Sequence, residues 1–205
     1  MPLFHLELRA NLSGVHSVSW PADRGWTIDV KDPSGDSVRE GITVTAADGE
    51  TELEGSRGSA HLVMRFDKSS RHQASATLTN GTATRAEALA AGAGAGKKGG
   101  ASGGPLRGTL EAGDAGGWVP VASLECRGLE PVGFTVTGDG WTVTADANAG
   151  RSGGDDEGDG DDGPGTAPGT VFESAALEDD WCEYDETTGA SPEVMGLEGR
   201  WVRAP

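Results

Sequence analysis

The stretch LELRANL at residues 6–12 returns near the middle of the chain as LECRGL at residues 124–129. Apolar and polar side chains alternate in both copies, which is typical of a β-strand with one buried face. Each copy is followed, after a turn-rich stretch, by a second strand-like phrase that opens on tryptophan, Trp26–Val30 and Trp141–Thr144. This repetition predicts a fold built from two related β units.

The same alternation continues through most of the chain, for example in residues 42–46, 62–66, 74–78 and 195–201. Turn signals such as Asp48-Gly49 separate these runs, whereas helical patterns are short and weak. One-sided alternation with short turns predicts an all-β fold, an antiparallel sandwich or barrel in which the two units pack together.

Two stretches lack the apolar side chains that a core requires. Residues 83–105 are dominated by Ala, Gly, Ser and Lys, and residues 150–168 by Gly and Asp. Neither can bury enough surface to offset the entropy of ordering it, so both are expected to be disordered low-complexity insertions. The prediction is a single domain over residues 1–205, with an N-terminal half at 1–82 and a C-terminal half at 106–149 and 169–205.

The formal net charge of −17 disfavours nucleic acid and anionic membranes as partners. Part of this charge lies in the acidic run at residues 155–162, which we interpret as a solvated spacer. The first residues show neither a basic region nor an apolar run, and no apolar window approaches transmembrane length. We expect a cytoplasmic protein with an unknown protein partner; its oligomeric state stays open.

Three phrases in the same order carry a family resemblance: GSRGSA at 55–60, ECRGLEP at 125–131, and GTVF at 169–172 with Leu177, Asp180-Trp181 and Tyr184-Asp185 behind it. In order and spacing they resemble the eukaryotic CXXC-motif-containing zinc-binding proteins, a family of unsettled function. The likeness spans nearly the whole chain outside the two insertions. It implies a compact β protein with two related halves and one structural zinc ion in the N-terminal half, held by two Cys-x-x-Cys pairs.

The resemblance places the four zinc cysteines at Asp32, Gly35, Phe66 and Ser69, none of which is cysteine. A structural zinc site takes four thiolate or imidazole ligands in a closed tetrahedron. Phe66 also shares the apolar face of its strand with Leu62 and Met64. We therefore expect no zinc and no other cofactor, with core packing and turn chemistry in place of the metal.

No other constellation predicts chemistry, so no catalytic or cofactor-binding residue is assigned. The residues GAGAGKK at 92–98 do not match a phosphate loop, and no strand precedes them. Cys126 faces inward, and Cys182 lies among carboxylates that disfavour a thiolate. A different metal site would have to draw on residues whose spacing matches no metal motif: His61, His72, Asp36 and Asp67.

Several surface features have two interpretations each. Glu7 and Arg9, with Glu125 and Arg127 at the equivalent places, form either a charged ladder between the halves or solvated strand faces. Arg57 either binds an anion or supports a turn. The aromatic residues near the C-terminus are either an exposed recognition patch or core: Trp181, Tyr184 and Trp201.

Three functions follow, in order of preference. The first is a non-enzymatic cytosolic member of the family that has lost its zinc and acts in protein–protein interaction or scaffolding. The second is metal binding or delivery through other ligands, aided by the acidic run. The third is an enzyme with a polar cleft between the halves that uses Arg57 or Arg127.

Overall fold

The computed structural model describes residues 1–67, 72–90, 105–138, 140–150 and 166–204. The strands in this part of the chain are β1 (Leu3–Ser13), β2 (Val15–Ser19), β3 (Trp26–Lys31), β4 (Val38–Val44), β5 (Thr51–Glu52), β6 (Ser59–Ala60), β7 (Leu62–Met64), β8 (Ala74–Asn80), β9 (Thr109–Glu111), β10 (Val119–Arg127), β11 (Glu130–Thr135), β12 (Trp141–Asp146), β13 (Pro168–Ala175), β14 (Trp181–Cys182) and β15 (Glu193–Arg203). They are accompanied by α1 (Arg85–Ala90) and the 3-10 helix η1 (Ala112–Asp114).

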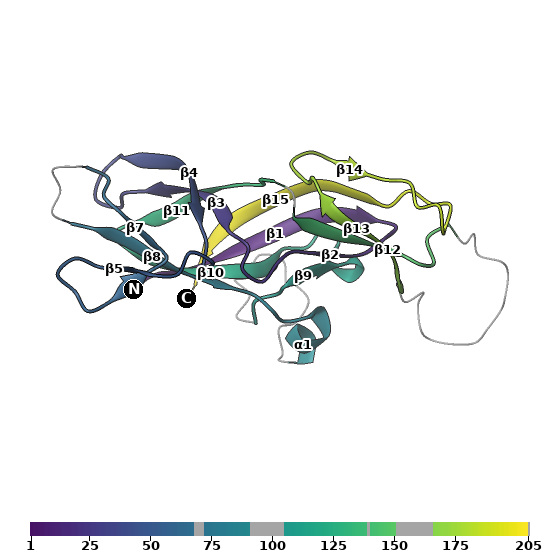
Figure 1. Ribbon diagram of the computed structural model, residues 1–205, viewed down its shortest axis with the longest axis horizontal. Coiled ribbons are helices and arrows are strands. Elements are labelled where there is room, and N and C mark those ends of the chain that lie inside the picture. The colour runs from purple at the N-terminus through teal and green to yellow at the C-terminus, as the bar shows by residue number, and fades with distance from the viewer. Residues whose placement is uncertain (68–71, 91–104, 139, 151–165, 205) are drawn as a thin grey trace.

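The strands form one long sheet and two smaller ones, β5 and β6 form a separate two-stranded sheet, and every pair of neighbouring strands is antiparallel. The long sheet has the order β14-β15-β1-β10-β8-β7, and the smaller sheets have the orders β11-β3-β4 and β13-β12-β2-β9. The smaller sheets lie toward opposite ends of the long strands β1 and β15 (Figure 1). The predicted all-β antiparallel fold is confirmed.

The two halves predicted from the sequence share all three of these sheets. β3 pairs with β4 of its own half and with β11 of the other, and β12 likewise pairs with β13 and with β2. In the long sheet, β1 pairs with β15 and β10, and β10 pairs with β8. The halves therefore exchange strands, and neither completes a large sheet alone. The duplication itself stays a prediction.

The core is centred on three tryptophans. Trp26 and Trp141 are each no more than 1% exposed, and Trp20 lies edge-on to both, with ring centroids 5.8 Å and 5.5 Å away. The Arg24 guanidinium lies 3.9 Å over the Trp141 ring and donates to the Thr137 carbonyl at 2.8 Å. Aromatic rings thus fill the space where the two tryptophan-initiated strands meet.

The predicted inward face of the last strand included Met195 and is wrong at that residue. The alternation assigned Met195, Leu197 and Trp201 to one face, but Met195 is 39% exposed and Val194 is buried. At Gly196 and Leu197, two residues of β15 stand opposite a single residue of β1, and Gly196 has a φ of +60°. This β-bulge reverses the alternation, so Leu197 and Trp201 turn inward while Met195 turns outward.

The first insertion begins later than predicted. Residues 83–90 are ordered and include α1, whose entry is capped reciprocally: the Thr84 N–H donates to the Glu87 carboxylate at 2.7 Å, and the Glu87 N–H donates to the Thr84 hydroxyl at 3.3 Å. Ala88 of α1 is buried. Residues 105, 150 and 166–168 of the predicted insertions are also described, and β13 begins at Pro168, inside the second one; residues 91–104 and 151–165 lie outside the described residues. Among the described helices, none is long and apolar enough to span a membrane.

Candidate functional site

The first pair of positions that the resemblance assigns to zinc, Asp32 and Gly35, lies in the turn between β3 and β4. Asp32 Oδ1 accepts hydrogen bonds from the Ser34 hydroxyl at 2.6 Å and the Ser34 N–H at 2.8 Å. These bonds hold the pKa of Asp32 below its ordinary value of 3.8. The Asp32 carbonyl accepts the Gly35 N–H at 3.2 Å. The carboxylate therefore closes the turn, in the manner of an Asx turn.

The second pair begins with Phe66, which follows β7. Its ring is half-buried and packs against the hydrophobic core, and its carbonyl accepts a hydrogen bond from Arg39 Nη2 at 2.9 Å. Ser69 lies outside the described residues. Arg39 was not predicted from the sequence, because a bond from a side chain to a distant backbone carbonyl leaves no motif.

The residues at these positions do not fit a zinc ion. Gly35 has no side chain and the Phe66 ring has no ligand atom, while Asp32 Oδ1 is occupied by two hydrogen bonds. Throughout the described part of the chain, no group of three or more His, Cys, Asp or Glu side chains is placed to hold a metal ion.

His61 belongs instead to the packing of the long sheet. Its side chain is 12% exposed, and its Nδ1 accepts the Leu78 N–H of β8 at 2.9 Å. Since that nitrogen is already used, it is unavailable to a metal. Within the described residues, His61 is not gathered with His72, Asp36 and Asp67 into one group.

The two cysteines differ in environment. Cys126 is buried in β10, and burial, with smaller contributions from Glu130 and Glu125, raises its thiol pKa to about 12. Such a thiol is neither a nucleophile nor a metal ligand at neutral pH. Cys182 is exposed on β14.

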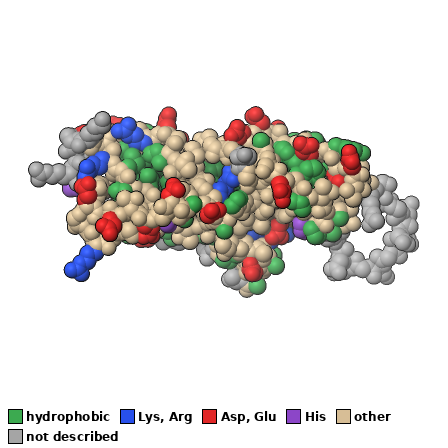
Figure 2. Space-filling model, viewed as in Figure 1, with side chains coloured by type: hydrophobic (Ala, Val, Ile, Leu, Met, Phe, Trp, Pro, Cys, Tyr) green, Lys and Arg blue, Asp and Glu red, His purple; other side chains and the backbone are tan. Residues whose placement is uncertain are grey.

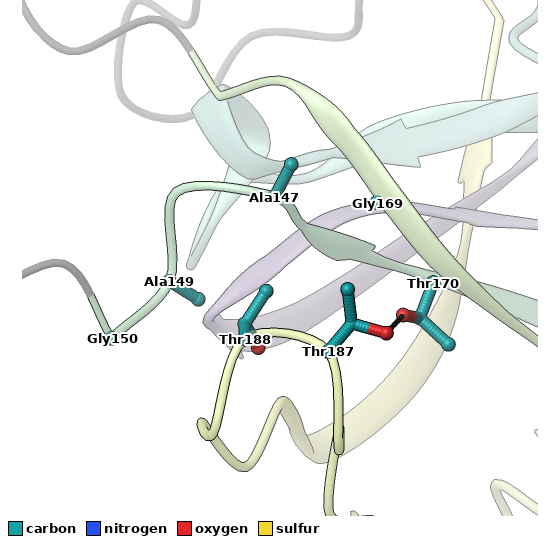
Figure 3. A pocket seen from close by; sticks show the side chains of 7 residues that line it. All are labelled: Ala147, Ala149, Gly150, Gly169, Thr170, Thr187 and Thr188. Carbon is teal, nitrogen blue, oxygen red and sulfur yellow. Dashed lines mark hydrogen bonds between the residues drawn. The ribbon is translucent and has the colours of Figure 1, made fainter.

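A pocket of about 530 Å³ lies between the ends of β12 and β13 and the turn after β14 (Figure 3). Its lining contains small neutral residues without a titratable side chain: Ala147, Ala149, Gly150, Gly169, Thr170, Thr187 and Thr188. Its three threonine hydroxyls have no histidine, lysine or carboxylate beside them in the lining that could act as a general base.

Asp185 organises the threonines of this pocket and is only 1% exposed. Its carboxylate accepts bonds from the Thr170 hydroxyl at 2.8 Å, the Thr187 N–H at 2.9 Å and the Thr188 hydroxyl at 2.9 Å. Burial by itself would raise the pKa of Asp185, but the hydrogen bonds outweigh it and hold the pKa below the ordinary 3.8. Asp185 therefore holds β13 to the turn after β14 as a carboxylate.

Asp185→Asn is expected to lower the melting temperature at pH 7, because the neutral amide cannot accept all three bonds. Because the pKa of Asp185 is lower in the folded state than in the unfolded chain, the ionised carboxylate stabilises the fold above the pKa of the unfolded chain. This stabilisation is lost as the pH falls through the pKa of the folded state. The difference between variant and wild type should therefore shrink below pH 3.8. Thermal melts followed by circular dichroism at a series of acidic pH values measure this difference in melting temperature. Asp48→Asn, at an exposed position, is the control. A difference that stays constant through the acid range would contradict this role.

The charged ladder between equivalent places in the two halves is not formed. Where β1 pairs with β10, Glu7 stands opposite Pro120, so neither Glu125 nor Arg127 faces it. The charges pair across β1 and β15 instead. The interpretation as a ladder between these places therefore does not hold, whereas Glu125 and Arg127 are exposed, as the other interpretation of solvated strand faces expects.

Glu7 accepts a hydrogen bond from Arg200 Nε at 2.8 Å, and Arg9 is bonded to Glu198. Both guanidinium groups lie over the Trp118 ring, at 4.6 Å for Arg9 and 4.2 Å for Arg200. Glu7 is buried, so the alternative of a solvated strand face fails for it as well.

The C-terminal aromatic residues do not form one exposed patch. Trp181 is buried against Phe172, with ring centroids 5.3 Å apart, and Trp201 is half-buried and donates to the Gly133 carbonyl at 3.0 Å. Tyr184 alone is fully exposed, at 62%.

Arg57 is exposed in the hairpin turn between β5 and β6. Backbone bonds between Leu53 and Gly58 close this turn, and the Ser56 hydroxyl accepts the Gly58 N–H. The turn is therefore closed without the Arg57 side chain. The residues 92–98 and 155–162, for which a linker and a solvated spacer are predicted, lie outside the described residues.

The family description "CXXC motif containing zinc binding protein, eukaryotic" matches residues 5–152. Among solved structures, the crystal structure of C1orf123 superposes with a TM-score of 0.65 at 20% identity and covers 98% of this chain and 99% of that chain. A hypothetical protein from Plasmodium falciparum superposes with a TM-score of 0.66 at 16% identity, covering both chains completely. No curated protein matches the sequence.

Proposed function

This chain belongs to the eukaryotic CXXC motif containing zinc binding protein family, and we propose that it is a zinc-free, non-enzymatic member that binds a protein partner in the cytoplasm. The loss of zinc is supported by the residues at the four assigned positions. Gly35 and Phe66 supply no ligand atom, and Asp32 is committed to its turn. The structural relatives support the fold and carry no enzymatic name.

A binding rather than a catalytic role is supported by the state of the reactive groups. The Cys126 thiol is buried, with its pKa raised to about 12. The pocket beside Asp185 has a neutral lining, and Asp185 itself is satisfied by hydrogen bonds. Metal handling by the acidic run at 155–162, the alternative function, would rely on residues outside those described.

The observation that carries the proposal is the charge of one end of the molecule. Residues 166–199, which form β13, β14 and most of β15, contain nine acidic residues and no lysine or arginine. We call this surface the acidic end. Exposed apolar side chains accompany the carboxylates there: Val171 at 53%, Tyr184 at 62% and Met195 at 39%. Figure 2 shows acidic and hydrophobic side chains together over this end, whereas most of the visible Lys and Arg atoms lie elsewhere.

Four carboxylates of the acidic end are exposed on β13 and in the two turns beside β14: Glu173, Asp179, Glu183 and Glu186. Gly150, the last described residue before the acidic insertion, lies against the Thr188 carbonyl at this same end. A surface rich in carboxylates, with exposed aromatic and aliphatic groups, suits a partner with a basic segment that carries apolar side chains.

Neutralising these four carboxylates, as E173Q/D179N/E183Q/E186Q, is expected to abolish retention of the partner from cytoplasmic lysate. The measurement is quantitative mass spectrometry of proteins retained by the immobilised chain at two salt concentrations. Retention by the wild type should fall as salt rises, because the attraction is electrostatic.

The matched control is D36N/E40Q/D48N/E52Q, which removes the same charge from exposed positions far along the sequence. This control should retain the same proteins as the wild type. Equal loss in both variants would show an effect of net charge alone, and equal retention in all three proteins would contradict the acidic end as the binding surface.

A further inference from the structure

We propose that Arg39 and Phe66 hold the β3–β4 hairpin against the segment that follows β7, and that they do so in place of a zinc ion. The proposal rests on the zinc-free part of the proposed function and is independent of the acidic end. It assigns to two residues of this chain the mechanical task that a structural metal performs, which is to hold separate segments together.

β3 anchors the hairpin through its pairing with β11 and its buried Trp26, Ile28 and Val30, whereas the first residues of β4 have little attachment besides β3. β4 is an outer strand of its sheet, and its residues 38–41 are all exposed. A segment with few buried side chains opens locally at low cost. The first residues of β4 therefore depend on whichever contacts join them to the rest of the molecule beyond their pairing with β3.

Local bonds determine the shape of the hairpin. Asp32 closes its tip through Ser34, and the Asp29 carboxylate accepts the Gly41 N–H at 2.9 Å where β4 bulges. Gly41 has a φ of +66° there, a conformation that favours glycine. All of these bonds lie within β3, β4 and their turn, so they shape the hairpin without attaching it to the other sheets.

Arg39 attaches this part of β4 to the segment that follows β7. Its Nη2 donates to the Phe66 carbonyl at 2.9 Å across a separation of 27 residues. The Phe66 ring packs against the core, so the acceptor is itself anchored. A charged, planar guanidinium on a long side chain suits this bond, because it reaches across the gap and keeps its charge in solvent.

One end of this bridge, Phe66, is itself an assigned metal position, and the other end, Arg39, lies in the strand that follows the hairpin tip where the first pair is assigned. The first Cys-x-x-Cys pair falls at the tip of the hairpin, on Asp32 and Gly35, and the second begins at Phe66. The Arg39 bond thus joins the same two segments that a zinc ion at those positions would join. Phe66 contributes twice, because its carbonyl accepts the bond and its ring supplies apolar packing.

Arg39→Ala in the full chain is expected to lower the melting temperature by about 3 °C and to accelerate amide hydrogen exchange in β4. The matched control is Arg57→Ala, which removes the same charge from an exposed hairpin turn. Phe66→Leu, which keeps apolar packing and the carbonyl, should be milder than Phe66→Ala. If Arg39→Ala behaves like Arg57→Ala in both measurements, the bridge does not hold the hairpin and the proposal is overturned.

The metal is tested separately on the wild-type chain. Elemental analysis should detect far less than one zinc per chain, and a strong chelator should leave the melting temperature and β4 exchange unchanged. Stoichiometric zinc, or melting induced by the chelator, would overturn both the bridge and the zinc-free function. A zinc-free chain that tolerates Arg39→Ala would overturn the bridge alone.

Discussion

Trp141→Ala is expected to lower the free energy of unfolding by about 3–5 kcal/mol, which corresponds to a drop in melting temperature of about 10 °C. Trp141 is fully buried between Trp20 and Trp26 and lies under the Arg24 guanidinium. Truncation removes the indole from the place where the two halves meet. It leaves a cavity that the three large neighbouring side chains, Trp20, Trp26 and Arg24, cannot refill. Urea denaturation followed by far-ultraviolet circular dichroism measures the loss.

The matched control is Trp118→Ala, which removes a half-buried indole that stacks under Arg9 and Arg200. Its cost should be clearly smaller, because less apolar surface returns to water. Trp141→Phe should also be milder, since the buried Trp141 indole N–H has no hydrogen-bond partner among the described residues. A loss for Trp141→Ala no larger than that for Trp118→Ala would place the centre of the core elsewhere.

Arg107→Ala is expected to cost about 3 kcal/mol of unfolding free energy. Arg107 is 5% exposed and its Nη2 lies 2.8 Å from Asp114 Oδ2 and 3.5 Å from Glu111 Oε1. Its removal leaves a nearly buried carboxylate at Asp114, which retains only Arg85 at 3.3 Å as a charged partner. Denaturant unfolding of the full chain measures the effect.

Two comparisons separate this buried pair from ordinary surface charge. Arg65→Ala breaks an exposed pair with Glu54 and should cost less than about 1 kcal/mol. The double variant R107M/D114N should be less destabilised than the sum of its single changes, because the two side chains lose their interaction only once. Strict additivity would show that the buried pair has no coupling.

Alternation predicted the local structure well because strand geometry is local. Phe4, Leu6 and Leu8 point inward as predicted, since successive side chains of an extended backbone leave on opposite faces. The same rule failed at Gly196, where a bulge inserts one residue. A bulge depends on the neighbouring strand, so the period of one strand cannot reveal it.

The candidate site was predictable only in part. That the positions assigned by the resemblance lack cysteine is read directly from the sequence, and the partial burial of Phe66 follows from its alternation with Leu62 and Met64. The Arg39 bond and the three bonds to Asp185 were not predictable, because each joins segments that only folding brings together. The charged partners of Glu7 were misjudged for the same reason, since Arg200 lies 193 residues away.

The sequence by itself determined the all-β class, the inward faces of most strands, the acidity of the C-terminal region and the absence of zinc ligands at the assigned positions. These properties depend on side-chain chemistry and on the period-2 geometry of a single strand. The tertiary structure alone decided which strands pair, that the halves exchange strands, and that Arg39 reaches Phe66. Strand pairing is decided by long-range packing around the shared tryptophan core. The local sequence pattern of one strand does not indicate which distant strand will pair with it.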